Sequence, residues 1–95
     1  MHNFKVKIQG RVQGVGFRYY TEREAIRLGI TGWVRNCVGG SVEVFICGEA
    51  HQTQAMLAWL KRGPPSANVS AVCVEEMQIE ETQARATSTH FEIRS

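Results

Sequence analysis

The order of strand-like and helix-like segments is the feature of this sequence that most limits its fold. Apolar and polar residues alternate in several short segments, as in β-strands, and two segments show the three- and four-residue spacing of amphipathic helices. The expected strands lie at 4–8, 30–36, 41–47, 69–79 and 90–94, and the expected helices at about 19–28 and 50–62. The apolar phase of the 69–79 segment changes near Glu75-Glu76, which predicts either a bulge or a strand break there. The chain is therefore predicted to follow the order β-α-β-β-α-β, with a short extra terminal strand.

That order is typical of the ferredoxin-like α+β fold, a sandwich in which two helices cover one face of an antiparallel sheet. In this topology the first two strands run parallel on either side of the third, so their carboxyl ends share one edge of the sheet, about 10 Å apart. The loop after the first strand should therefore lie beside the end of the second, which places Arg18 near Asn36. Gly39-Gly40, between the second and third strands, favours a tight hairpin, because type I′ turns need positive φ at both central residues.

Length and composition fit a single small domain over residues 1–95, since 43% of the 95 residues are hydrophobic and 21% are charged. No apolar run approaches the ~20 residues that span a bilayer, and residues 1–7 lack the apolar segment of a signal peptide. We therefore expect a cytoplasmic monomer with no membrane partner. The three cysteines fit a reducing compartment, and Cys47 and Cys73 should lie two strand spacings apart, beyond the ~7 Å reach of a disulfide.

Charge is distributed unevenly along the chain, although the formal net charge is only +2. Residues 1–35 contain seven Lys and Arg against two Glu, a net charge of +5, whereas residues 36–95 contain four against seven, a net charge of −3. An anionic partner is therefore expected at the N-terminal third. The chain has no Asp, and its His and Cys residues lack metal-ligand spacing, so we expect neither a metal site nor a cofactor.

A glycine-rich run, residues 10–18, connects the first expected strand to the first expected helix. Gly14 and Gly16 can adopt positive φ, which lets successive N–H groups turn inward as an anion-binding nest, and the helix start adds further open donors. Arg18 supplies a guanidinium that can bind two phosphate oxygens. The run lacks the Lys of a Walker A loop, and Tyr19 stands where a dinucleotide motif needs its last glycine. On glycine content alone, an ordinary connection with a surface arginine is the simpler interpretation.

Two longer blocks favour the phosphate site over that simpler interpretation. The runs GRVQGVGFRY (10–19) and LGITGWVRN (28–36) resemble the acylphosphatase family, and residues 39–44, 63–67 and 91–94 agree further. The resemblance covers nearly the whole chain and implies a ferredoxin-like enzyme that hydrolyses acyl phosphates to a carboxylate and inorganic phosphate. It implies catalytic roles for Arg18 in binding phosphate and for Asn36 in orienting the attacking water. It also implies a phosphate-binding loop made of Gln13, Gly14, Val15, Gly16, Phe17 and Arg18. The turn at 37–40 departs mildly from the family, in which Asp or Lys more often accompanies the Gly.

Arg18, Asn36 and the glycine-rich loop would be enough for this hydrolysis because an acyl phosphate is a mixed anhydride. Its leaving group is a carboxylate with a pKa of about 4 to 5, which departs without a proton, so no general acid is essential. Catalysis then reduces to positioning and electrostatics around a loose transition state, which Arg18 and the nest can supply. An amide such as Asn36 has no useful basicity, so we hypothesise that the water's proton passes to the substrate phosphate. The expected partners are a small acyl phosphate and, as product or inhibitor, phosphate or other anions.

An RNA-binding module of the RRM type is the main alternative, since it shares the strand and helix order and the N-terminal third is basic. An RRM displays aromatic residues on its first and third strands. Here the first strand offers no exposed aromatic partner to Phe45, and the glycine-rich run falls in a loop. The sequence therefore favours the hydrolase and no nucleic-acid partner. A third possibility is a domain that handles carbamoyl phosphate, because the family resemblance also covers such domains inside larger maturation proteins.

Overall fold

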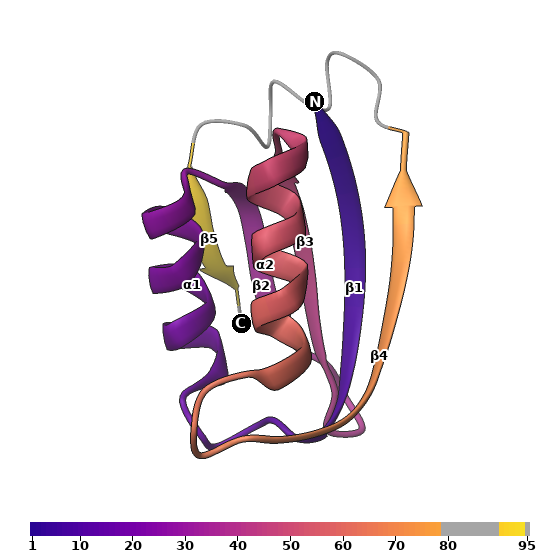
Figure 1. Cartoon of the computed structure of the whole chain (residues 1–95). Coiled ribbons are helices and arrows are strands. Elements are labelled where there is room, and N and C mark those ends of the chain that lie inside the picture. The colour runs from indigo at the N-terminus through magenta and orange to yellow at the C-terminus, as the bar shows by residue number, and fades with distance from the viewer. Residues whose placement is uncertain (79–89, 95) are drawn as a thin grey trace.

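A computed structural model describes residues 1–78 and 90–94 of the chain. Within these residues the strands and helices follow the predicted order, and both helices pack on one face of a single sheet (Figure 1). The elements are β1 (His2–Arg11), α1 (Phe17–Leu28), β2 (Thr31–Asn36), β3 (Val42–Gly48), α2 (Ala50–Arg62), β4 (Asn68–Met77) and β5 (Phe91–Arg94). The predicted ferredoxin-like α+β fold is confirmed. The last residue of the predicted fourth strand, Ile79, lies outside the described residues.

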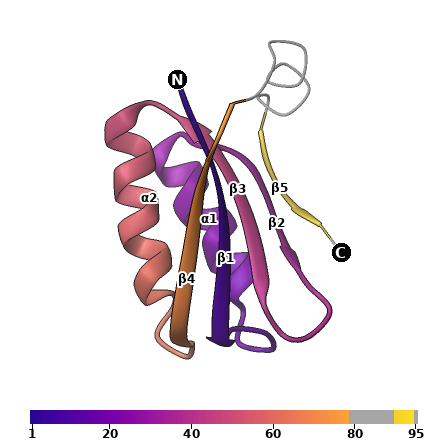
Figure 2. The same ribbon diagram turned by 90° about the vertical axis from the view of Figure 1, so that its right-hand side faces the viewer.

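The sheet has the strand order β4-β1-β3-β2-β5. Because β1 and β2 both pair antiparallel with β3, they run parallel to each other, and their carboxyl ends share one edge of the sheet as predicted. β5 pairs parallel with β2, so the sheet is mixed rather than wholly antiparallel (Figure 2). β4 runs opposite to β1 and therefore to β2, so β5 runs opposite to β4.

The core lies between the sheet and the helices, where alternate strand residues and one face of each helix are removed from water (Figure 2). Fully buried side chains are worth roughly 1.5 to 3 kcal/mol each relative to exposure, so this layer fixes how the helices sit on the sheet. Its completely buried members include Val6, Ile8, Val12, Ala25, Val34, Val42, Val44, Ile46, Met56 and Leu60. The strand faces turned away from the helices carry most of the charged residues.

Two predicted details of the helices and strands change in the structure. α1 begins at Phe17, slightly before the start expected at about residue 19, because Gly16 caps it in the left-handed conformation. The β1–β4 ladder is regular from Asn3 to Gln9 and shifts register only between Gln9 and Gly10. The irregularity predicted at Glu75-Glu76, a bulge or a strand break, is therefore absent. Met77 pairs with Asn3, so it lies on the sheet face away from the helices. The alternation of β4 therefore continues through Glu75-Glu76 without an extra residue.

Across residues 1–78 and 90–94, neither helix is long or apolar enough to cross a lipid bilayer. The same part of the chain holds three free cysteines, of which Cys47 is buried and Cys73 is exposed. β1 lies between the strands of these two residues, as expected from the topology. Burial raises the pKa of the Cys47 thiol, because the apolar surroundings disfavour the thiolate.

Candidate active site

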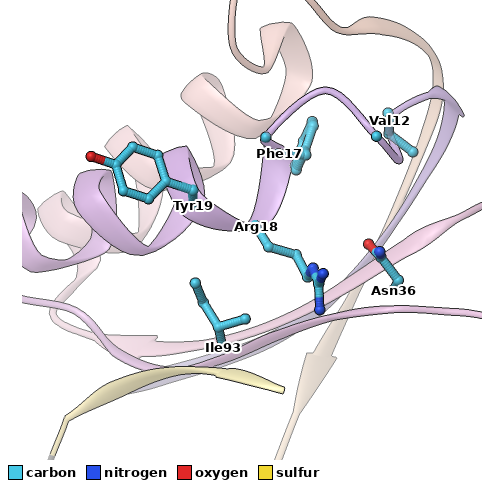
Figure 3. Close-up of a pocket in the computed structure, with 8 residues that line it drawn as sticks. Val12, Phe17, Arg18, Tyr19, Asn36 and Ile93 are labelled. Carbon is cyan, nitrogen blue, oxygen red and sulfur yellow. The ribbon is translucent and has the colours of Figure 1, made fainter. Parts of the chain in front are cut away.

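A cavity of about 230 Å³ opens at the edge of the sheet where β1 and β2 end (Figure 3). Its walls come from the loop after β1, the first turn of α1, the end of β2 and the middle of β5. The lining residues are Val12, Gly14, Gly16, Phe17, Arg18, Tyr19, Asn36 and Ile93. The fold therefore brings Arg18 and Asn36 together in one cavity, as the topology predicted.

The loop before α1, residues 12–16, is called the phosphate loop below. Gly14 and Gly16 both adopt left-handed backbone conformations, with φ of 75° and 76°, which side chains with a Cβ rarely accept. Gly16 is the N-cap of α1, and within residues 1–78 and 90–94 this helix start has no side-chain cap hydrogen bond. The N–H donors of the first turn and the positive end of the helix dipole stay open beside the cavity. The local geometry is that of an anion-binding helix start.

The Arg18 guanidinium is anchored by β5. Its Nη1 donates a hydrogen bond of 3.0 Å to the backbone carbonyl of Arg94. Figure 3 shows the side chain reaching from α1 towards Asn36, while Ile93 lies on its other side. A guanidinium has five N–H donors, so this single bond orients the group and leaves donors for a ligand.

Arg94 in turn is held on the open face of the sheet. Its Nε donates to Glu92 Oε1 at 2.8 Å, and its guanidinium lies 4.9 Å from the centroid of the Trp33 ring. The hydrogen bond from Arg94 lowers the pKa of Glu92. These contacts hold residue 94 in place, and its backbone carbonyl is the acceptor for Arg18.

Gln13 and Val15 do not line the cavity, and hydrogen bonds fix both in supporting positions. Gln13 Nε2 donates to the carbonyls of Cys37 and Ser41, each at 2.8 Å, so the phosphate loop is tied to the hairpin that follows Asn36. On the other side, Ser66 Oγ donates to the Val15 carbonyl at 3.0 Å. The sequence places Gln13 and Val15 in the phosphate-binding set, but it carries no sign of these bonds, because every acceptor is a backbone carbonyl.

The hairpin loop, residues 37–41, holds the end of β2. The Cys37 N–H donates to the Ser41 carbonyl at 2.8 Å, and the Gly40 N–H donates to the Cys37 carbonyl at 3.3 Å. Both Gly39 and Gly40 have positive φ, as the hairpin prediction required. The Gly40 N–H bonds to the Cys37 carbonyl, so the central residues of the turn are Val38 and Gly39 rather than Gly39 and Gly40. Val38 does not have a positive φ, so the predicted type I′ turn is not formed.

Two residues that line the cavity, Ile93 and Tyr19, are not among the predicted site residues. Ile93 is 41% exposed and Tyr19 is 49% exposed, which is high for such apolar side chains. Ile93 enters the cavity because β5 pairs parallel with β2, a pairing that no local pattern announces. The eight lining residues include no Asp, Glu or His, so the described cavity has Arg18 as its charged group.

No group of three or more His, Cys or Glu side chains within residues 1–78 and 90–94 is arranged to hold a metal ion. The Glu43 carboxylate on β3 is paired with Lys5 and Arg35 on the open face of the sheet. Burial alone would raise its pKa, but hydrogen bonds from Arg35 and Lys5 on the open face outweigh that effect, and the pKa of Glu43 lies below its usual value. Arg35 Nη2 lies 2.6 Å from Glu43 Oε1.

An arginine and an open helix start share one cavity of this α+β fold, an arrangement suited to binding an anion. Comparison with known proteins is more specific, because the sequence model of the acylphosphatase family matches residues 4–93. The chain therefore belongs to the acylphosphatase family, and the predicted enzyme class is confirmed.

Individual relatives support the same assignment. The acylphosphatase of Paraburkholderia xenovorans is 47% identical, with 90% of this chain and 88% of that protein covered. That of Rhizobium etli is 54% identical, with 80% and 81% covered. The crystal structure of the acylphosphatase from Bacillus subtilis superposes over 100% of both chains with a TM-score of 0.87 at 33% identity.

Proposed function

We propose that this chain hydrolyses acyl phosphates by binding the phosphoryl group in the phosphate loop and directing a water molecule held by Asn36 at phosphorus. One observation carries the proposal: a single cavity of about 230 Å³ contains the Arg18 guanidinium, the open start of α1 and the Asn36 side chain. These are a fixed cation, a set of aligned N–H donors and a hydrogen-bonding amide. They are the groups that a phosphoryl transfer without a strong acid or base requires.

Arg18 and the backbone N–H groups of residues 13–18 would bind the phosphoryl oxygens. In this assignment Gln13 contributes through its N–H, since its side chain already donates to Cys37 and Ser41. The anchor on the Arg94 carbonyl supports the role of Arg18, because a guanidinium held in place needs little reorganisation as charge develops on the phosphoryl group.

Asn36 would accept a hydrogen bond from the attacking water through its side-chain carbonyl and hold that water in line behind phosphorus. Its place at the last residue of β2 supports this, because the Gln13 bonds fix the following hairpin loop against the phosphate loop. Asn36 takes no proton, so the proton of the water passes to a phosphate oxygen of the substrate. A pH–rate profile with an essential protein base near neutrality would contradict this route.

The open face of the sheet bears on the nucleic-acid alternative. Trp33 and Phe45 stack there with ring centroids 6.1 Å apart, a pair that the sequence did not suggest. However, Phe45 is only 5% exposed, and the guanidinium groups of Arg35 and Arg94 lie over the Trp33 ring. A base would have to displace both arginines, so we do not adopt this function. The monomeric state, the cytoplasmic location and the single domain stay predictions.

The decisive test is hydrolysis of benzoyl phosphate and carbamoyl phosphate with EDTA present. Arg18→Ala removes the charged group from the cavity, so kcat/KM should fall by about a thousandfold. Arg27→Ala is a matched control, since it removes an arginine from the exposed last turn of the same helix and should leave activity near wild type. Near-wild-type kcat/KM in Arg18→Ala would end the assignment.

A further inference from the structure

Ser66 reaches the phosphate loop from the connection between α2 and β4. Its Oγ donates a hydrogen bond of 3.0 Å to the carbonyl of Val15, which lies 51 positions away in the sequence. Figures 1 and 2 show the connection after α2 and the loop after β1 at the same end of the molecule. Gly14 and Gly16 line the cavity, whereas the lining residues include neither Val15 nor Ser66. The bond therefore directs the Val15 carbonyl to a side chain outside the cavity.

The Val15 carbonyl belongs to the same peptide unit as the Gly16 N–H. This peptide bond is trans, like the others of the described residues, and in a trans peptide the C=O and N–H groups point in opposite directions. Because Ser66 holds the carbonyl outside the cavity, the Gly16 N–H points to the other side, where Gly16 lines the cavity wall. The Ser66 bond thus sets the direction of one of the backbone donors assigned to phosphate in the proposed function.

The local backbone does not fix this direction by itself. Turning a peptide unit changes the φ of the residue that follows it, and Gly16 accepts positive and negative φ about equally well. The turned peptide would bring the Val15 carbonyl oxygen into the cavity, where its partial negative charge opposes an anion. We infer that Ser66 is a positioning residue, whose hydroxyl keeps the Gly16 N–H directed into the cavity as a phosphate donor. The inference rests on the proposed function and adds to it a residue from outside the cavity.

A closed turn holds the Ser66 hydroxyl in place. The Ala67 N–H donates to the Pro64 carbonyl at 3.0 Å, which closes a four-residue turn over residues 64–67. Pro65 occupies the first central position of this turn, where the φ that its ring imposes is the one required. Pro64 is buried, so the turn is attached to the interior of the protein. Ser66 therefore loses little conformational freedom when its hydroxyl binds the phosphate loop.

The same turn is packed against the start of α1. A Cβ placed on Gly63, the residue before the turn, would lie 2.8 Å from Phe17 Cε2, so the Gly63 backbone lies directly against that ring. Phe17 is the first residue of α1, and its buried ring also packs against Trp59 of α2 with centroids 6.0 Å apart. The donor hydroxyl and the acceptor carbonyl therefore both follow from elements that share one packed core.

The test follows the Gly16 amide proton by heteronuclear NMR while inorganic phosphate is added. In the wild type, phosphate should move this proton downfield, because an N–H that donates to an anion forms a short, strong hydrogen bond. In Ser66→Ala the movement should shrink to less than about half, and the dissociation constant of phosphate from the same titration should rise about threefold to tenfold.

Two further variants separate the hydroxyl from the turn that carries it. Ser66→Thr keeps the hydroxyl, so both the movement of the Gly16 proton and the phosphate affinity should stay within about twofold of wild type. Ser70→Ala is the matched control, since Ser70 is also an exposed serine but lies on β4. This control should leave both quantities unchanged.

Three outcomes would overturn the role of Ser66. The first is a wild-type Gly16 proton that phosphate does not move, and the second is an Ser66→Ala variant with the full movement and wild-type phosphate affinity. The third is a loss in Ser66→Thr as large as in Ser66→Ala, because the effect would then belong to the turn. If the wild type binds phosphate but hydrolyses neither benzoyl phosphate nor carbamoyl phosphate, the proposed function fails, while the NMR comparison still decides whether Ser66 orients Gly16.

Discussion

Two loops lie side by side at one edge of the sheet, and each contains two glycines with positive φ. In the phosphate loop these are Gly14 and Gly16, and in the hairpin loop they are Gly39 and Gly40. The hairpin loop closes on itself through two backbone hydrogen bonds, and its tip is fully exposed at Val38. The phosphate loop instead runs into the start of α1, where Gly16 is the N-cap and, among the described residues, makes no side-chain cap hydrogen bond. Glycines with positive φ therefore produce a turn in both loops. An anion site also needs backbone N–H donors that are left open, as at the start of α1.

The Gln13 side chain connects the phosphate loop to the hairpin loop through two hydrogen bonds. Its amide spans the hairpin loop from Cys37 to Ser41, so the residue before that loop, Asn36, is positioned relative to the phosphate loop. The first loop thus binds the phosphoryl group, and the second sets the position of the water in the proposed mechanism. The following predictions test this division.

Among the tests of this division between the loops, the largest effect is expected at Asn36. Asn36→Ala should lower kcat about a hundredfold because it removes the group that orients water, while KM and the inhibition constant of phosphate change by less than about threefold. Steady-state kinetics with benzoyl phosphate and added phosphate measure both quantities. An equal loss in phosphate affinity would show that both loops bind phosphate and would end the distinction between them.

A smaller effect is expected at the link between the loops. Gln13→Ala leaves the Cys37 and Ser41 carbonyls without their donor, which should lower kcat about tenfold, as Asn36 loses its fixed position, with little change in KM. Gln13→Glu has nearly the same shape but no N–H donors, so it should resemble Gln13→Ala. Full activity in Gln13→Glu would show that the shape of the side chain, and not its hydrogen bonds, supports the site.

The paired glycines allow a direct comparison at matched backbone strain. Gly16→Ala and Gly39→Ala each place a Cβ on a left-handed residue, so each should destabilise the fold by about 1 kcal/mol in urea unfolding. Only Gly16→Ala should also weaken inhibition by phosphate, by a few fold, because it displaces open N–H donors. If both variants weaken phosphate inhibition equally, the hairpin loop contributes to the anion site.

The smallest effect on activity is expected at Glu43, which faces away from both loops. Hydrogen bonds hold its folded-state pKa below the unfolded value, so its stabilisation is fully present above the unfolded pKa of about 4.3 and is lost as the pH falls through the folded pKa. Glu43→Gln should therefore lower the urea midpoint more at pH 7 than at pH 3, with unchanged kcat at neutral pH. Equal shifts of the midpoint at both pH values would contradict the ionic contribution.

Local patterns were enough to predict most of the fold. Alternation and helical spacing located the elements, and topology alone placed Arg18 beside Asn36, because the ends of two parallel strands must share an edge. The sequence predicted an irregularity in β4 because Met77 breaks its alternation of apolar and polar residues. The structure has instead an apolar residue on the open face, which alternation alone does not distinguish from a bulge.

The contacts that complete the site were not predictable in the same way. Arg18 is anchored by a residue 76 positions away, and Gln13 by residues 24 and 28 positions away. All three acceptors are backbone carbonyls, which every residue has, so no residue type marks them. Ile93 belongs to the cavity only through the parallel pairing of a four-residue strand. Such long-range backbone contacts depend on the folded topology and leave no local sequence signal.

The anchor of Arg18 has a consequence for how the enzyme is made. Ribosomes extend a chain from its N-terminus, so the phosphate loop, both helices and Asn36 are synthesised well before the carbonyl of Arg94 exists. Until β5 docks, Arg18 has no Arg94 carbonyl to bind and the cavity lacks the wall formed by Ile93. The site is therefore completed only when the four residues of β5 pair with β2.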